Sequence, residues 1–199
     1  MAETSTSPSR ADRREERSDE DLVAACAGGG VAELEELFER HGARIHRILA
    51  RLGFVAARDL DDMVQATFLE VQRSALSFDG RASAATWIAG IAVNLARHHA
   101  RGEARRRSAM SKVADSSATP AWRWPDEQAA HRQFLARLQS GYDELPHGLR
   151  AVFALCDLEG MRGVDAARVL GLPEGTVWRR LHEARLRLRA CLDADASKA

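Results

Sequence analysis

Apolar residues recur three and four positions apart along most of the chain, which is the spacing of helices with one buried face. A first helix is expected to begin near Asp19, with Leu22 and Val23 on its apolar side and three consecutive glycines at its end. A longer amphipathic helix follows from Ala32, and Gly53 closes it. The chain thus opens, after a polar stretch, with two predicted helices.

The helical pattern resumes after Asp59, a residue type that caps helix N-termini, and it continues to Val71. The sequence Phe-Asp-Gly at 78–80 predicts a turn. A further helix contains Trp87 and runs on into a basic segment at 98–107. These helices complete a predicted N-terminal helical domain.

The pattern fades over 108–125, a segment that ends in two tryptophans and two prolines and is the best candidate for a linker. A helix is expected to start near Asp126, and Pro146 opens the next one. The segment 163–182 then predicts a helix-turn-helix with Gly171 in its turn. The second helix of such a motif can enter the major groove of DNA.

Composition supports a fold that is all-α. Alanine, arginine and leucine are abundant, β-branched residues are scarce, and no proline lies between Pro8 and Pro120. We predict two small helical domains joined by a flexible linker, the second domain carrying the helix-turn-helix. The expected divisions are a disordered tail at 1–19, a helical domain at 20–107, a linker at 108–125, a helix-turn-helix domain at 126–193 and a tail at 194–199.

The charges change this picture, because the formal total of zero is a cancellation of 29 basic and 29 acidic side chains. Residues 1–80 carry a net charge of −6 and residues 81–112 a net charge of +6. Residues 113–174 carry −3 and residues 175–199 carry +3. A ligand within a Debye length of about 10 Å meets the local potential. Either basic segment can therefore face phosphate.

The second helix of the helix-turn-helix has two distinct faces on a 3.6-residue wheel. The face expected to enter the core comprises Val177, Leu181, Ala184, Leu188 and Cys191. The remaining positions are Arg179, His182, Glu183 and Leu186, flanked by Trp178, Arg180, Arg187 and Arg189. Such a donor-rich face favours DNA contacts, although an arginine-rich terminal helix is often only a solvated surface.

The basic helix before the linker also combines several types of side chain on one face. Trp87, Asn94, His98 and Arg101 share one face, and Arg97, Arg101 and Arg105 form a cationic ridge at i+4 spacing. An aromatic, an amide and cations suit the capture of an unpaired base and its backbone. The alternatives are that these cations are solvated and that Trp87 belongs to the core.

Several classes of function and site are excluded by what the sequence lacks. No apolar run approaches the roughly 18 residues of a membrane-spanning helix, so we expect a cytoplasmic protein with no membrane insertion. The cysteines Cys26, Cys156 and Cys191 sit on predicted apolar faces and are expected to be buried, reduced thiols. No metal, cofactor or catalytic residue is expected, since metal-ligand spacings and nucleotide or hydrolase motifs are missing.

Motifs in both halves resemble those of extracytoplasmic-function (ECF, group IV) sigma factors of the sigma-70 family. In the first half they are DDMVQATF at 61–68, FDGRASAATWI at 78–88 and IAVNLARHHAR at 91–101. In the second they are LEG at 158–160, LGLPEGTV at 170–177 and RLHEAR at 180–185. The resemblance covers about 20–193 and implies a sigma factor that binds core RNA polymerase, recognises the −35 and −10 promoter elements and promotes DNA melting.

The resemblance also implies roles for individual residues. The polymerase-binding set is Asp61, Asp62, Gln65 and Phe68. The set for the −10 element is Arg81, Ser83, Thr86, Trp87, Asn94, His98 and Arg101. The set for the −35 element is Thr176, Trp178, Arg179, Arg180, His182, Glu183 and Arg185. The expected partners are core RNA polymerase, promoter DNA and an anti-sigma factor.

Two other classes of function remain open on the residues alone. One is a helix-turn-helix regulator that acts on DNA without polymerase, and the other is an enzyme. A plain regulator has no need of the acidic stretch 61–68 joined to a base-capturing helix. An enzyme would need a phosphate-binding loop or a hydrolase motif, which the sequence lacks.

Overall fold

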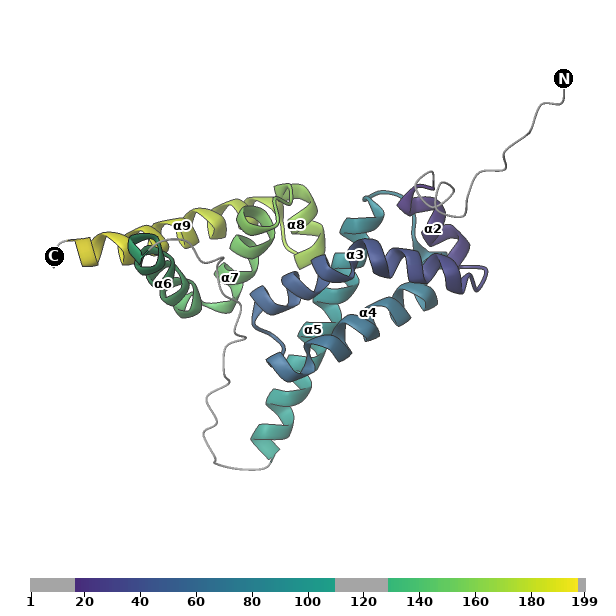
Figure 1. Ribbon diagram of the computed structural model, residues 1–199, viewed down its shortest axis with the longest axis horizontal. Helices are drawn as coiled ribbons and strands as arrows, with labels where there is room; N and C mark the ends of the chain where they lie inside the picture. The colour runs from purple at the N-terminus through teal and green to yellow at the C-terminus, as the bar shows by residue number, and fades with distance from the viewer. Residues whose placement is uncertain (1–16, 110–128, 197–199) are drawn as a thin grey trace, which may run out of the picture.

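The computed structural model describes residues 17–109 and 129–196. Within these residues the regular secondary structure consists of helices and helical turns without strands (Figure 1), which confirms the all-α prediction. Residues 1–16 of the tail expected at 1–19, and most of the expected linker, lie outside the described residues.

The described part of the N-terminal domain, residues 17–109, contains four α-helices and two short 3₁₀ turns. They are α2 (Asp19–Cys26), α3 (Val31–Leu52), η1 (Ala57–Asp59), α4 (Leu60–Ser74), η2 (Ala75–Ser77) and α5 (Ala84–Ala109). The apolar face of α3 is fully buried at Leu37, Ile48 and Leu49 and packs against α2, α4 and α5. Gly53 ends α3 in the left-handed conformation (φ 66°), which a glycine adopts without strain.

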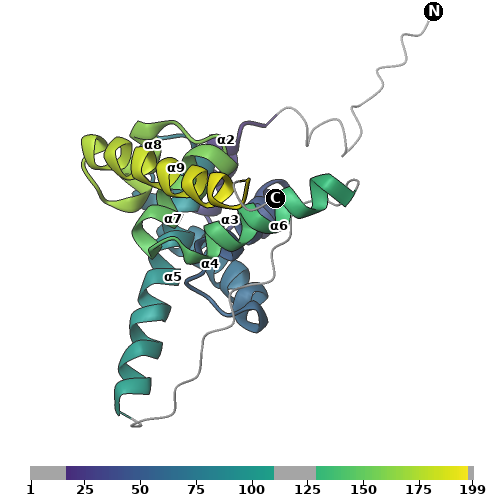
Figure 2. The ribbon, with the colours of Figure 1, turned by 90° about the vertical axis from the view of Figure 1, so that its left-hand side faces the viewer.

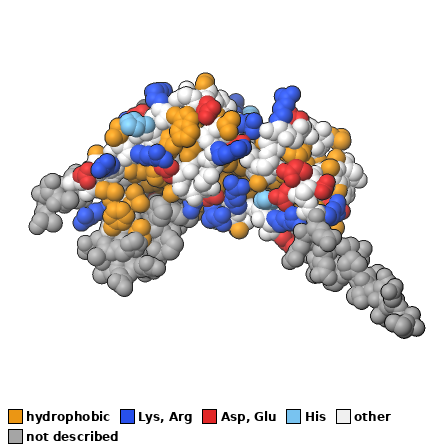
Figure 3. Space-filling view, turned by 90° about the horizontal axis from the view of Figure 1, so that it is seen from above, with side chains coloured by type: hydrophobic (Ala, Val, Ile, Leu, Met, Phe, Trp, Pro, Cys, Tyr) orange, Lys and Arg blue, Asp and Glu red, His pale blue; other side chains and the backbone are white. Residues whose placement is uncertain are grey.

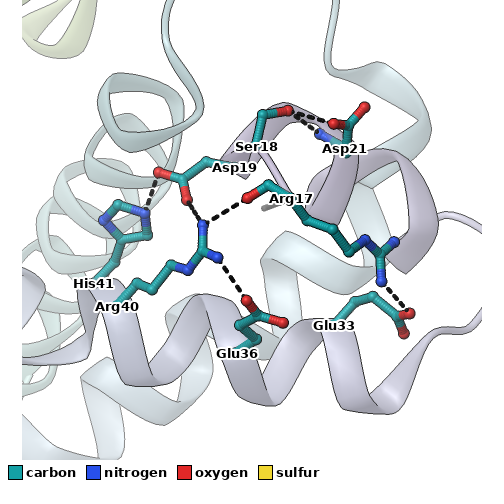
Figure 4. A network of polar contacts seen from close by, with 8 residues as sticks. All are labelled: Arg17, Ser18, Asp19, Asp21, Glu33, Glu36, Arg40 and His41. Atoms are coloured by element: carbon teal, nitrogen blue, oxygen red, sulfur yellow. Dashed lines mark hydrogen bonds and ion pairs between the residues drawn. The ribbon is translucent and has the colours of Figure 1, made fainter. Parts of the chain in front are cut away.

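Helix α2 is fastened to α3 by a polar network (Figure 4). Ser18 caps α2 by accepting a hydrogen bond from the backbone N–H of Asp21 (3.1 Å). The Asp19 carboxylate lies 2.8 Å from the Arg40 guanidinium and 2.7 Å from the His41 ring. Residues 17–19, which were expected in the tail, are therefore part of the folded domain.

The C-terminal domain contains α6 (Ala129–Glu144), α7 (His147–Phe153), a π-turn η3 (Ala154–Leu158), α8 (Gly163–Leu170) and α9 (Glu174–Ala196). Gly171 forms the turn between α8 and α9 with a φ of 62°, as its position in the sequence predicted. The face of α9 expected in the core is buried at Val177, Leu181, Ala184 and Leu188. The helix-turn-helix is thus confirmed.

Some details differ from the expectations. The apolar pattern after Pro146 continues without interruption, so it gave no sign of the π-turn, in which the Glu159 N–H bonds to the Ala154 carbonyl. Helix α5 runs to Ala109, two residues into the expected linker, and α9 runs to Ala196. Of the three cysteines Cys26 is buried, whereas Cys156 and Cys191 are only half-buried.

The two domains lie against each other. Helix α8 packs beside α5, and α7 with η3 packs against α3 (Figures 1 and 2). Hydrogen bonds cross this boundary at both ends: the Arg97 guanidinium donates to the Leu170 carbonyl (2.8 Å), the Tyr142 hydroxyl donates to the Arg51 carbonyl (2.7 Å), and the Arg51 guanidinium donates to the Leu158 carbonyl (3.1 Å). The sequence had suggested two independent domains, and this packing is a property of the folded chain.

Candidate nucleic-acid and polymerase interfaces

The face of α5 that was expected to capture a base begins with an aromatic pair. Trp87 is half-buried and packs against Phe78 with ring centroids 5.2 Å apart. Asn94, His98 and Arg101 follow on α5 and are exposed. Trp87 therefore fits both interpretations, as a core residue and as a platform for a base, because its ring borders the core and also lines an accessible surface.

The loop before α5 is held by local and long-range caps. The Asp79 carboxylate accepts the Arg81 backbone N–H (3.0 Å), and Ser83 Oγ accepts the Thr86 N–H (3.2 Å). The carboxylate of Glu20 on α2 accepts the N–H of Ala84 (3.1 Å) across 64 residues. Arg81 and Ser83 are exposed and Thr86 is buried, so the loop presents its cation outward. Sequence spacing alone could not have shown the contribution of Glu20.

A cavity of about 410 Å³ lies where this loop meets α5. Its N-terminal-domain lining is Phe78, Asp79, Arg81, Ala82, Thr86, Trp87, Gly90, Ile91 and Asn94. The aromatic rings, the amide and the guanidinium in this lining are groups that stack on and hydrogen-bond to a nucleobase. Its remaining wall comes from the other domain, through Arg168 and Val169 of α8.

The three arginines of the cationic ridge on α5 differ in their exposure and in their contacts. Arg101 and Arg105 are exposed, whereas Arg97 is partly buried with its guanidinium on the Leu170 carbonyl. Burial, together with the neighbouring cations Arg101 and Arg180, lowers the pKa of Arg97. Two basic segments that are far apart in the sequence therefore meet at one place in the fold.

The outer face of α9 mixes open and paired side chains. Arg179 and His182 are exposed, while Thr176 and Arg180 are half-buried. Arg185 is bound by Asp157 (2.6 Å), and Glu183 pairs with Arg187 (2.9 Å).

Trp178, in the same set, is 51% exposed and donates its indole N–H to Glu174 at 3.1 Å. Its ring lies so close to Gly163 that a Cβ at that position would meet it at 2.5 Å. Trp178 thus packs over the start of α8 while it keeps an open edge.

The acidic start of α4 forms a third surface. Asp61, Asp62 and Gln65 are exposed, as a contact surface requires. Phe68 is only 3% exposed and packs edge-on against Phe38 at a centroid distance of 5.0 Å.

The apolar side chains that reach solvent in this part of α3 and α4 are Phe38 (43% exposed) and Leu69. Neither residue was in the polymerase-binding set expected from the sequence, and helical spacing had placed Phe38 on an apolar face.

On the face seen in Figure 3, the described charged side chains are of mixed sign. In the view from above, basic side chains alternate with acidic and hydrophobic ones (Figure 3). Among the described residues there is no cluster of three His, Cys, Asp or Glu side chains that could hold a metal ion. In the same parts of the chain, no helix combines the length and hydropathy needed to cross a membrane.

A helix-turn-helix domain joined to a helix with an aromatic and cationic face defines a class of proteins that bind DNA. Within this class, residues 37–106 match the family model for sigma-70 region 2, and residues 135–188 match that for sigma-70 region 4.

The chain is 34% identical over 184 residues to the ECF RNA polymerase sigma factor SigM of Mycobacterium tuberculosis, covering 90% of this chain and 87% of that protein. It is 32% identical over 190 residues to the sigma factor CnrH of Cupriavidus metallidurans, covering 92% and 98% of the two chains.

Solved structures agree with these relationships. The structure of CnrH in complex with the cytosolic domain of CnrY matches with a TM-score of 0.65 and 30% identity, over 90% of this chain and 99% of that one. The sigma factor RpoE in complex with the anti-sigma factor NepR, from Bartonella quintana, shares the fold with a TM-score of 0.62, 20% identity and coverage of 83% and 99%.

The chain belongs to the sigma-70 family, in its group of ECF sigma factors. It is an alternative sigma factor for promoter recognition and transcription initiation, and its partners are core RNA polymerase and promoter DNA. Sigma factors are transcription initiation factors and not classical enzymes.

Proposed function

We propose that this sigma factor divides promoter recognition between its two basic helices in the following way. The cavity beside Trp87 and Asn94 receives an unpaired base of the −10 element, while His98 and Arg101 hold the backbone next to it. The exposed face of α9, led by Arg179 and His182, enters the major groove of the −35 element. The observation that carries this proposal is the 410 Å³ cavity lined by rings, an amide and a guanidinium, in the same chain as a helix-turn-helix.

The loop residues Arg81, Ser83 and Thr86 complete the −10 site in this proposal. Arg81 offers a cation at the mouth of the cavity, and Ser83 with Thr86 fixes the start of α5, since the Ser83 hydroxyl donates to Thr86 Oγ1 at 3.0 Å. In the −35 site, Thr176, Arg180 and Arg185 contact the phosphate backbone, and Trp178 and Glu183 border the bases. Arg185 must exchange its partner Asp157 for phosphate to do so.

Core polymerase is proposed to bind the start of α4. Asp61, Asp62 and Gln65 supply an acidic and hydrogen-bonding edge, and Phe38 supplies exposed apolar area next to it. Phe68 contributes by supporting the Phe38 ring from beneath. We place the protein in the cytoplasm, where polymerase acts, and assign it no catalytic activity of its own.

An anti-sigma factor is the further partner that we propose. The solved structure of CnrH, which is 30% identical to this chain, contains the cytosolic domain of CnrY. Affinity purification of the tagged protein from its native host, followed by mass spectrometry, tests this. Recovery of a stoichiometric protein that blocks polymerase binding supports the proposal, and recovery of polymerase subunits alone contradicts it.

The function is tested by adding the purified full chain to core RNA polymerase with fragments of the host genome. We expect transcripts that start at a defined set of promoters. The variant Asn94→Ala should still bind polymerase and duplex −35 DNA but should lose open-complex formation. Gln72→Ala on α4 is the matched control and should behave as the wild type. Normal DNA melting by Asn94→Ala would overturn the assignment of the cavity, and a lack of polymerase binding by the wild type would overturn the larger scheme.

The alternative of a regulator that acts without polymerase predicts a different result. Such a protein would bind duplex DNA tightly by itself, and added polymerase would not change its sequence preference. The exposed acidic edge of α4, which has no use in DNA binding, favours the sigma-factor scheme.

A further inference from the structure

Helix α2 precedes the residues that match the family model for region 2, which begin at residue 37. Its apolar side is nevertheless part of the core, since Leu22 and Val23 are fully buried and Cys26 is 1% exposed. The helix packs against α3, α4, α5 and η2. None of the residues proposed above for binding polymerase or promoter DNA lies on α2. Its contact with α5, however, connects it to the −10 site.

The first turn of α2 reaches two different helices. Asp19 binds Arg40 (2.8 Å) and His41 (2.7 Å) of α3, as Figure 4 shows. The next residue, Glu20, accepts the backbone N–H of Ala84 at the start of α5 (3.1 Å). Adjacent carboxylates therefore join α2 to α3 and to α5. The start of α5 is thus bound to a helix that is itself fastened to the rest of the domain.

A carboxylate suits the start of α5 for two reasons. The first N–H groups of an α-helix have no acceptor within the helix, and the helix dipole places partial positive charge at that end. Ser83 accepts the Thr86 N–H from within the same loop (3.2 Å). Such a local cap moves together with the loop. Glu20 comes from another helix, so its hydrogen bond fixes the position of α5 within the domain.

The residues that follow this hydrogen bond line the −10 cavity. Thr86 and Trp87 lie in the same helical turn as Ala84, and both contribute to the lining. The Trp87 ring packs against Phe78 at a centroid distance of 5.2 Å. Because a helix moves as a hydrogen-bonded unit, a displaced first turn would shift Trp87 relative to the loop that forms the opposite side of the cavity.

We propose that Glu20 is a positioning residue for promoter opening. It holds the first turn of α5, and with it Trp87 and the loop 79–86, in the arrangement that receives the unpaired base. The inference rests on the proposed function, because it takes the cavity beside Trp87 as the −10 site. Helix α2 then takes part in DNA melting through α5 and not by contact with DNA.

The test uses holoenzyme assembled from core RNA polymerase and the full chain, on a promoter mapped in the transcription experiment. Glu20 is exposed, so Glu20→Ala removes the acceptor without opening a cavity in the core. We expect open complexes, followed by the fluorescence of 2-aminopurine in the −10 element, to form about fivefold more slowly, the typical effect of losing a helix cap. Binding to core polymerase and to duplex −35 DNA should equal that of the wild type.

Two variants separate positioning from a general loss of stability. Glu20→Gln keeps a side-chain oxygen that can accept the Ala84 N–H and should recover most of the rate. Ser18→Ala removes the cap of α2, which accepts the Asp21 N–H (3.1 Å), and should leave the rate unchanged because it does not touch α5. Hydrogen exchange followed by NMR gives a readout independent of DNA: the Ala84 N–H should exchange about fivefold faster in Glu20→Ala and at the wild-type rate in Ser18→Ala.

The outcomes distinguish this inference from the proposed function. Wild-type opening by Glu20→Ala, with Asn94→Ala unable to open DNA, would overturn the positioning role and leave the promoter scheme intact. Wild-type opening by Asn94→Ala would overturn the assignment of the cavity, and this inference with it, whatever Glu20→Ala does. A Glu20→Gln variant as slow as Glu20→Ala, or equal slowing by Ser18→Ala, would show that Glu20 does not act as the acceptor that places α5.

Discussion

Helices α5 and α9 are both rich in arginine, but their arginine side chains differ in how far they are exposed to solvent. On α5 the cavity beside Trp87 has one wall formed by α8, and Arg97 is bound to a backbone carbonyl of the other domain. On α9 the Arg179 side chain remains open to solvent. The difference teaches that a cationic pattern identifies a surface that can bind DNA, whereas the packing of the domains decides how far its arginines are exposed.

The polymerase surface sharpens this comparison, because Asp61, Asp62 and Gln65 lie open to solvent, whereas one wall of the cavity beside Trp87 comes from α8. Asp62→Arg reverses a charge on the exposed edge of α4 and should weaken binding to core polymerase by about tenfold or more, since like charges across an interface are costly. Binding to duplex −35 DNA should not change. Surface plasmon resonance with immobilised core polymerase measures the first effect and fluorescence anisotropy the second. An equal loss of both would show that the variant is misfolded.

The open face of α9 is tested by the double variant Arg179→Ala with Arg180→Ala. Affinity for a duplex −35 fragment should fall, and the slope of log K against log salt should become shallower by about 0.9 for each phosphate that is no longer neutralised. Anisotropy titrations at several salt concentrations give the slope. Arg73→Ala, which removes an exposed arginine from α4, serves as the control and should leave the slope unchanged. A wild-type slope in the double variant would show that these arginines point away from the DNA.

The boundary between the regions is tested at Gly53, which has a φ of 66° and faces Arg150 of α7. An added Cβ would meet Arg150 Nη1 at 2.7 Å and would displace a guanidinium that donates to the Leu145 carbonyl at 3.3 Å. Gly53→Ala should lower the free energy of unfolding by about 1–2 kcal/mol. Chemical denaturation measures the change.

The matched control for Gly53 is Gly80→Ala. Gly80 has nearly the same backbone (φ 69°), and nothing would lie within 4 Å of an added Cβ. It should therefore show only the backbone cost, which is roughly 1 kcal/mol for a left-handed position. If the two variants were equally destabilised, Arg150 would have no part in holding the boundary.

The smallest expected effect concerns the network on α2, which belongs to region 2 alone. Burial raises the pKa of Asp19, but Arg40 and His41 outweigh it and hold the pKa below its ordinary value. The carboxylate therefore contributes stability that is fully present above about pH 4, the pKa range of an unfolded Asp, and is lost as the pH falls further. The stability difference between the wild type and Asp19→Asn should shrink on acidification below that pH. Urea unfolding at several pH values measures it, and a difference that stayed constant down to about pH 2 would contradict the prediction.

Much of the fold follows from local sequence. The 3.6-residue spacing of apolar side chains predicted α3, α4 and α9, because a helix must bury one stripe whatever lies opposite. Gly53 and Gly171 predicted chain reversals, since each takes a left-handed backbone. Exposed polar site residues such as Asp62 and Arg179 were also predictable, because a charged side chain on the polar face of an amphipathic helix remains in contact with water.

The remaining features required the tertiary structure. The spacing of apolar residues placed Phe68 on the buried face of its helix, but only the structure shows that its ring packs against Phe38, which reaches solvent. The cap that Glu20 gives to Ala84 and the ion pair between Arg51 and Glu159 join residues 64 and 108 positions apart. Periodicity within one helix carries no information about such pairs, because they depend on how different helices meet.

The sequence by itself determined the helices, the helix-turn-helix, the two basic segments and the resemblance to ECF sigma factors, since each rests on local spacing and residue type. Only the tertiary structure decided that Arg97 faces Leu170, that α8 forms one wall of the cavity beside Trp87 and that Glu159 lies among three arginines. These features arise when the two domains pack together, and the free energy of that packing is spread over interactions that no single segment of the chain contains.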